Sequence, residues 1–153
     1  MVRDNVFVYL TDIHTGEVTE IESSHNIALT YMLTILPRWL AGVNNTGYNA
    51  TEPPTQIELG SGAGTPQVTD TGLFTPIPAY LTSLSYVQMD TPSAGSITLV
   101  FQIPAGVVSG QVTEALLRDT SANPWSHTMF PAPFTPVSTQ TITVKWVQTA
   151  THA

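Results

Sequence analysis

A glycine- and proline-rich stretch at residues 57–78 limits what this chain can fold into more than any other feature. Its sequence is IELGSGAGTPQVTDTGLFTPIP: a short alternating strand, three glycines at every second position, and a threonine-rich loop. A phosphate-binding glycine turn needs a helix directly after the glycines, because N–H groups at the helix start face the anion. Pro66, Pro76 and Pro78, with threonines among them, oppose such a helix. The stretch therefore predicts a strand that runs into a long loop, and it excludes a nucleotide-binding turn.

Alternating apolar residues predict strands along most of the chain. Segments 6–10 and 18–21 flank a Thr-Gly turn and predict an N-terminal hairpin. The remaining expected strands are 81–89, 97–103, 112–118, a segment at Met129 and Phe130 after a turn at 123–125, and 139–148. Short strands separated by turn signals predict a mainly β protein, an antiparallel β-sandwich of jelly-roll-like or immunoglobulin-like type. The length of 153 residues predicts a single β-rich domain over 1–153.

One helix is expected in the N-terminal half of the chain. Ser23, Ser24 and Asn26 are all competent N-caps, and apolar residues recur at i, i+4 spacing through 27–40. A second apolar face on the same segment predicts a helix that is buried on nearly all sides. The residues of this helix that we expect to contact another subunit are Ile27, Tyr31, Ile35 and Trp39.

Two long polar contact loops are expected, at 43–55 and 60–78. The second exceeds the roughly 12–15 residues that unstructured connections usually reach, and such loops are usually functional or ordered by a partner. It contains no lysine, so we expect an arm that contacts a neighbouring protein; a mobile surface loop is the alternative. The residues of the arm assigned to subunit contacts are Gly60, Gly62, Gly64, Pro66, Asp70, Leu73 and Phe74.

Charged side chains are scarce in this protein. They make up 10% of the residues, the net charge is −7, and only four residues are Lys or Arg. Nucleic-acid binding depends on clustered Lys and Arg, so neither nucleic acid nor an anionic membrane is an expected partner. The longest apolar run is too short to span a bilayer. A charge-poor surface suits a protein that other subunits cover, although a neutral polar β surface has the same composition.

No pattern of residues predicts catalysis, a cofactor or a metal site. The four histidines, at 14, 25, 127 and 152, lack metal-binding spacing and read as surface or hydrogen-bonding residues. Glu17, Glu20 and Glu22, near Asp12, could serve glycoside hydrolysis or bind calcium, but protection of a strand edge explains them as well. There is no cysteine, which removes disulfides, thiolate zinc sites and cysteine nucleophiles. We therefore expect a protein that is not an enzyme.

The stretch at 57–78 also carries a family resemblance. A strand that ends in Gly60-x-Gly-x-Gly-x-Pro66, followed by Asp70-Thr-x-Leu73, resembles small virion proteins of tailed bacteriophages, such as tail, tail-collar and fibre proteins. The segment from Asn26 through 40 and a late Thr-x-Thr-x-x-Trp strand ending at Trp146 are similar too. The resemblance covers about 26–147 and implies a role in a particle, with no chemistry.

These observations lead to one expected function and two alternatives. The expectation is a structural component of a tailed-phage virion, in the tail, collar or fibre base, assembled in the cytoplasm of the host bacterium. Its partners would be copies of itself, as a trimer or higher oligomer, and other virion proteins. The first alternative is a decoration or head-fibre protein that stabilises the capsid lattice. The second is a carbohydrate-binding module for a host-surface glycan, for which Trp125 and Tyr48 are the aromatic residues in expected loops.

Overall fold

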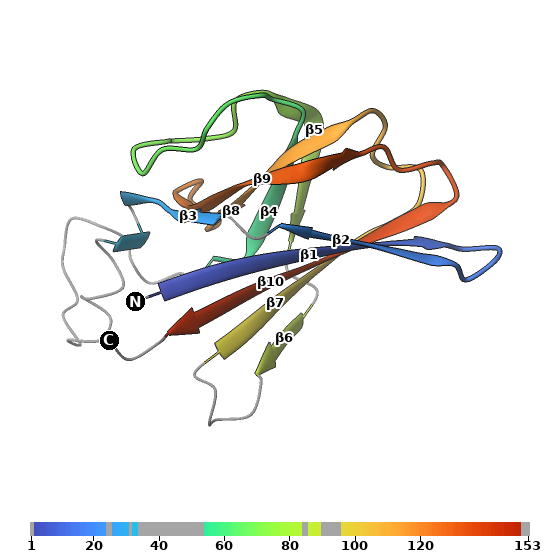
Figure 1. The fold of residues 1–153 in the computed structure, drawn as a ribbon, viewed down its shortest axis with the longest axis horizontal. Helices are drawn as coiled ribbons and strands as arrows, with labels where there is room; N and C mark the ends of the chain where they lie inside the picture. The colour runs from blue at the N-terminus through green and yellow to red at the C-terminus, as the bar shows by residue number, and fades with distance from the viewer. Residues whose placement is uncertain are drawn as a thin grey trace.

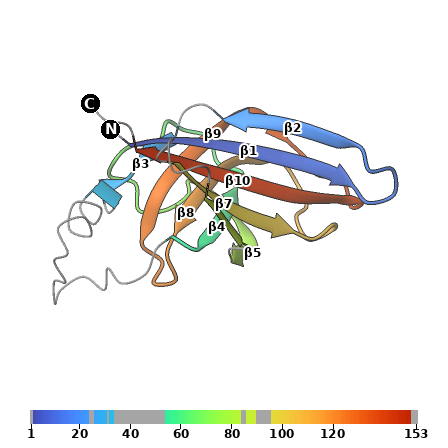
Figure 2. The same cartoon turned by 90° about the horizontal axis from the view of Figure 1, so that it is seen from below.

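Two five-stranded antiparallel sheets make up the fold (Figures 1 and 2). The computed structural model describes residues 2–23, 26–30, 32–33, 54–83, 86–89 and 96–150. Sheet A has the strand order β2-β1-β10-β7-β6, formed by Val18–Ser23, Val2–Asp12, Gln140–Ala150, Ser96–Ile103 and Tyr86–Met89. Sheet B has the order β3-β9-β8-β4-β5, formed by Asn26–Ala28, Pro124–Phe134, Val112–Arg118, Gln56–Gly60 and Pro76–Ser83. The mainly β character expected from the sequence is confirmed.

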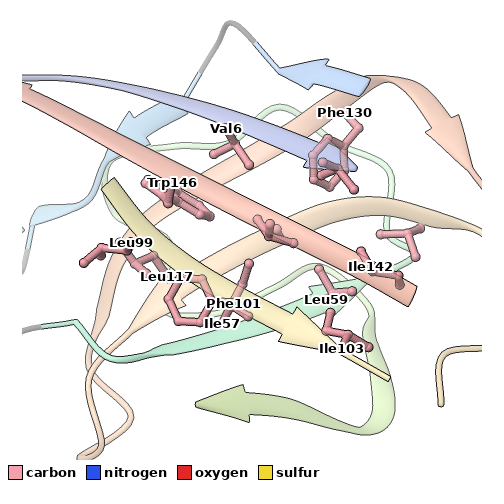
Figure 3. Packing of buried hydrophobic residues seen from close by; sticks show 14 of the residues in the cluster. Val6, Ile57, Leu59, Leu99, Phe101, Ile103, Leu117, Phe130, Ile142 and Trp146 are labelled. Atoms are coloured by element: carbon pink, nitrogen blue, oxygen red, sulfur yellow. The ribbon is translucent and has the colours of Figure 1, made fainter. Parts of the chain in front are cut away.

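Each sheet turns one face toward a shared hydrophobic core (Figure 3). Successive side chains of a strand point to opposite faces, so every second residue enters the core. Sheet A contributes Val6, Phe101 and the fully buried Trp146, and sheet B contributes Ile57 and Leu117. The arrangement is sandwich-like, with one core between two sheets.

The N-terminal hairpin is confirmed, and Asp12 closes its turn. The Asp12 carboxylate accepts hydrogen bonds from the hydroxyl of Thr139 (2.6 Å) and from the N–H groups of His14 (2.8 Å) and Thr15 (2.9 Å). These bonds stabilise the charged form and lower the pKa of Asp12 to about 2, with Thr139 the largest cause. The turn is thereby joined to the connection between β9 and β10.

The first residues expected to be helical form an edge strand instead. Asn26–Ala28 is β3 and pairs antiparallel with β9, with Ile27 opposite His127. Pairing with a neighbouring strand satisfies backbone N–H and C=O groups as a helix would, and such tertiary context overrides local propensity. The prediction that a helix begins at 23–26 is therefore wrong.

A helical turn follows β3. Leu33 donates its N–H to the carbonyl of Leu29 (3.1 Å), and Met32 is buried in the core, whereas Leu33 exposes 50% of its surface. A helix buried on nearly all sides would hide Leu33, so that prediction is wrong for the part of the segment that the structure describes. The expected contact residues Tyr31, Ile35 and Trp39 lie outside the described residues, as does most of the loop expected at 43–55.

Two expected strand boundaries also differ from the structure. The strand predicted at 81–89 is replaced by β5 in sheet B and β6 in sheet A. Strand β5 begins at Pro76 and lies at the edge of its sheet, where a missing N–H is tolerated. Strand β9 begins at Pro124, so Trp125 belongs to a strand and is buried, and the loop position expected for a sugar-stacking ring is wrong.

Candidate functional site

The segment 61–75, which we call the crossing loop, runs across the outer face of sheet B (Figure 1). It leaves β4 after Gly60 and returns at the start of β5, Pro76. On the way, the carbonyl of Val68 accepts hydrogen bonds from the N–H (2.8 Å) and hydroxyl (2.7 Å) of Thr30, which follows β3. Strands β4 and β3 lie on different sides of β8 and β9, so the crossing loop spans most of the sheet.

Three buried side chains lie beneath the crossing loop. Ala115 and Leu117 of β8 point into the core, so Glu114 and Leu116 point to the outer face of the sheet. Strand pairing places His127 of β9 opposite Leu116 on that same face. The exposed fractions of Glu114, Leu116 and His127 are 0%, 2% and 0%, although the outer face of a two-sheet fold usually meets solvent. The crossing loop contacts Glu114 through Gly62 and Thr75 and His127 through the ring of Phe74, and so covers these two side chains.

The Glu114 carboxylate binds both ends of the crossing loop. Its Oε1 accepts hydrogen bonds from the N–H groups of Gly62 (2.9 Å) and Thr75 (2.9 Å). Its Oε2 accepts the N–H of Phe74 (3.0 Å) and lies 2.9 Å from Nε2 of His127. A buried carboxylate that accepts this many bonds replaces the hydration that it loses on burial.

His127 extends the cluster to the middle of the crossing loop. Its Nδ1 lies 3.0 Å from Oδ2 of Asp70, an oxygen that also accepts the N–H of Gln67 (2.9 Å). Both ring nitrogens therefore face carboxylate oxygens, and the imidazolium form, with two N–H donors, satisfies both contacts. The ring of Phe74 covers the imidazole at 5.0 Å between centroids. The buried cluster Asp70–His127–Glu114 thus fixes the loop at three places along its length.

The pKa of Glu114 lies below its ordinary value of 4.5. Burial acts to raise this pKa, because the charged form loses its hydration. The hydrogen bonds from His127, Thr75, Phe74 and Gly62 favour the charged form and outweigh burial. Glu114 is therefore ionised in the folded protein at neutral pH. A lowered folded-state pKa contributes stability that is present above pH 4.5 and is lost as the pH falls through the folded-state value.

The three alternate glycines allow the crossing loop to approach this cluster. A Cβ on Gly60 or on Gly62 would lie 2.5 Å from Oε1 of Glu114, and a Cβ on Gly64 would lie 2.7 Å from the Phe74 ring. Separations below about 3 Å overlap the van der Waals radii of the atoms. The glycines are thus explained by close contact within this chain, where the sequence suggested contact with a neighbouring protein.

Replacing Gly62 with alanine should lower the free energy of unfolding by about 1–3 kcal/mol through overpacking. The added Cβ would meet the backbone nitrogen of Thr75 at 2.9 Å, and that nitrogen cannot retreat without lengthening its bond to Glu114. Urea unfolding followed by circular dichroism measures the loss. Gly72→Ala is the matched control, because no atom lies within 4 Å of a Cβ at that loop position. Equal destabilisation by the two variants would contradict the explanation.

The outward surface of the crossing loop carries no charge. Asp70 is its only ionisable residue and turns inward to His127. Val68 and Phe74 expose 49% and 40% of their surfaces. The other exposed residues are small or hydroxyl- and amide-bearing: Ser61, Ala63, Gly64, Thr65, Gln67, Thr69, Thr71 and Thr75. The result is an ordered, neutral and partly apolar surface.

The buried cluster is built for anchoring. Both nitrogens of His127 are engaged by carboxylates and neither is exposed, so the ring offers no nitrogen to an incoming substrate. Within the described ranges, no group of three or more His, Cys, Asp or Glu side chains could hold a metal ion. A membrane-spanning helix is likewise not found among the described residues.

An open hollow of about 410 Å³ lies away from the cluster, on sheet A. It is lined by Gln102, Ile103, Pro104, Thr141 and Thr143, at the end of β7 and the start of β10. None of these side chains is ionisable, so the hollow supplies no acid, base or charged ligand.

Six of the expected contact residues lie in the crossing loop, namely Gly62, Gly64, Pro66, Asp70, Leu73 and Phe74, and Gly60 is the last residue of β4 before it. Pro66 is in the same loop and is buried, whereas Ile27 lies in β3. Glu114 and His127 were missed as anchors. Their signals were an acidic residue inside the apolar strand VTEALLR and a histidine inside WSHTMF.

The fold and the site define a two-sheet β protein whose outer face carries a loop held by the buried cluster of Asp70, His127 and Glu114. No protein-family model, curated protein or solved structure matches the chain.

Proposed function

We propose that this protein is a non-enzymatic structural subunit of a tailed-bacteriophage virion and that the crossing loop is one of its contact surfaces. The observation that carries the proposal is a neutral loop surface, with Val68 and Phe74 exposed, that the chain's own buried cluster holds in place. A surface ordered before binding loses less conformational entropy when a partner docks. Neutral, partly apolar composition is typical of the centre of a protein interface.

A second apolar surface supports contacts with more than one neighbour. Ile13, Val107 and Val137 expose 56%, 52% and 54% of their surfaces and lie in three different connections. The N–H of Ile13 bonds to the carbonyl of Thr139 (2.9 Å), which brings the β1–β2 turn beside the β9–β10 connection. In Figures 1 and 2 this hairpin end lies far from β3, where Val68 is bound. Two different patches suit a head-to-tail contact, which forms a ring when its rotation closes.

The proposed partners are copies of this chain, as a trimer or higher oligomer, and other virion proteins. The proposed place is the tail, collar or fibre base of a particle assembled in the bacterial cytoplasm, which follows from the resemblance at 57–78. Copy number in purified particles tests this position. A count that matches the symmetry of a tail or fibre supports it, and a count that matches the capsid lattice would favour a decoration protein instead.

Within the sandwich-like arrangement, we propose the jelly-roll-like type over the immunoglobulin-like type. In the constant-type immunoglobulin domain, the first and last strands belong to different sheets. Here β1 and β10 are neighbours in sheet A and pair along their whole length, from Val2 opposite Ala150 to Asp12 opposite Gln140.

Self-association tests the contact surface directly. We expect the purified chain to form an oligomer in light scattering coupled to size-exclusion chromatography, and Val68→Asp to raise its dissociation constant about ten- to a hundredfold. An aspartate there buries a charge in the interface while the backbone bonds of residue 68 remain. Thr120→Asp, at an exposed position outside the crossing loop, should leave association unchanged. A wild-type chain that stays monomeric and does not bind to particles would refute the proposal.

A further inference from the structure

The carboxyl group of Glu114 has no free position for a proton. Two backbone N–H groups occupy Oε1, and a backbone N–H and a ring nitrogen occupy Oε2. When both ring nitrogens of His127 donate to carboxylates, a proton on either oxygen of Glu114 turns an acceptor into a donor that faces other donors, which breaks at least one bond. Asp70 differs, because its described bonds use only Oδ2 and its side chain is 16% exposed.

We propose that Glu114 makes the crossing loop a proton-operated latch: the loop is docked while Glu114 is ionised, and proton uptake by Glu114 releases residues 61–75 from a still-folded pair of sheets. The inference deepens the proposed contact function and rests on it for its biological meaning, since release would dissolve the ordered surface around Val68 and Phe74. The release itself is a property of the isolated chain.

The surroundings of Glu114 favour this assignment. His127 on β9 is its nearest ionisable neighbour, and Asp70 on the crossing loop is reached through His127. The other described charged groups on this face, Glu58 on β4 and Arg118 on β8, pair with each other at 3.3 Å. Glu114 is thus the ionised group that bonds directly to the loop backbone at both of its ends.

The sheets do not depend on this cluster for their packing. The shared core is formed by inward residues of both sheets, and Glu114 and His127 are on the opposite face of sheet B. Loss of the loop uncovers Glu114 and His127 and leaves the core closed. Burial raises the pKa of Glu114, but the bonds from His127 and from the loop N–H groups outweigh it and hold this pKa below 4.5. The ratio of released to docked loop should therefore rise as the pH falls below 4.5, by at most about tenfold per pH unit. The ratio stops rising once the pH is below the pKa that Glu114 has while the loop is docked.

A spin label on the crossing loop tests the latch. The chain has no cysteine, so Thr69→Cys allows a single label at an exposed loop position. We expect the mobile component of its electron paramagnetic resonance spectrum to grow below pH 4.5 while the far-ultraviolet circular dichroism of the sheets is unchanged. A label at Ser109→Cys, in the exposed β7–β8 connection, should keep its spectrum over the same range.

Two variants identify the proton acceptor. Glu114→Gln should make the loop label mobile at neutral pH and remove its pH dependence, whereas Asp70→Asn should retain a transition in the acid range. A transition that is lost in Asp70→Asn but kept in Glu114→Gln would overturn the proposal. The proposal would also be overturned if the loop label on the otherwise wild-type chain stays immobile until the sheets unfold. This second test can be read even if Glu114→Gln does not fold. The spin-label spectrum and the circular dichroism are both measured on the dilute, isolated chain. They therefore test release of the loop even if the chain does not self-associate.

Discussion

Glu114→Gln should lower the free energy of unfolding at neutral pH by about 3–5 kcal/mol, the range seen when one partner of a buried ion pair is removed. The amide keeps the size of the carboxylate, but its NH₂ group faces donors, and it leaves His127 beside an uncharged partner. Urea or guanidinium unfolding at pH 7 measures the loss.

Glu17→Gln is the matched control for this change. Glu17 is exposed in the hairpin turn, and surface substitutions of this kind usually stay within about 0.5 kcal/mol. A Glu114→Gln variant as stable as the wild type would show that the buried cluster does not hold the crossing loop. A loss that is equal at pH 7 and well below pH 4.5 would also be inconsistent, because the wild-type carboxyl is protonated at low pH.

Trp146→Ala should lower the free energy of unfolding by about 3–5 kcal/mol, through lost burial and the cavity that remains. Trp146 is 0% exposed, and β10 places it in the core between β1 and β7, opposite Val6 and Leu99 (Figure 3). Strands paired on both sides cannot collapse freely into the space that the indole leaves.

Thr143→Ala on the same strand is the comparison for Trp146→Ala. Thr143 is half-buried on the outer face of sheet A, so its loss should cost at most about 0.5–1 kcal/mol. Chemical unfolding of both variants should be followed by circular dichroism, because Trp146→Ala removes a fluorophore and so changes the fluorescence signal itself. Similar losses for both variants would mean that the inward and outward faces of β10 are wrongly assigned.

The alternation of apolar and polar residues predicted the strands that have one face in the core and the other outside it. Strands β7, β8 and β10 were expected close to their observed bounds, since every second residue in them enters the core. The hairpin was expected too, but its first strand, predicted at 6–10, is Val2–Asp12. The sequence did not predict which strands share a sheet, because strand pairing joins residues that are far apart in the chain. The segment 26–28 shows the limit most clearly: apolar i, i+4 spacing predicted a helix, but pairing with β9 made it a strand.

The candidate site was predicted only in part for the same reason. The glycines and Phe74 were predicted to contact another protein, and the structure places them against Glu114 and His127 within the chain. Glu114 and His127 lie at positions that alternation assigns to the solvent face, so local pattern gave no reason to bury them. Only the path of residues 61–75 over that face makes them interior, and nothing in β8 or β9 alone specifies this path.

The pairing of β1 with β10 has a consequence for how the chain reaches its native state. These central strands of sheet A come from opposite ends of the sequence, and their register joins Val2 to Ala150. During synthesis β1 has no β10 beside it until residues 140–150 have left the ribosome, and contacts of such long sequence separation form slowly. Until then, β1 can pair only with β2, and the nascent chain exposes the other edge of β1 to its neighbours.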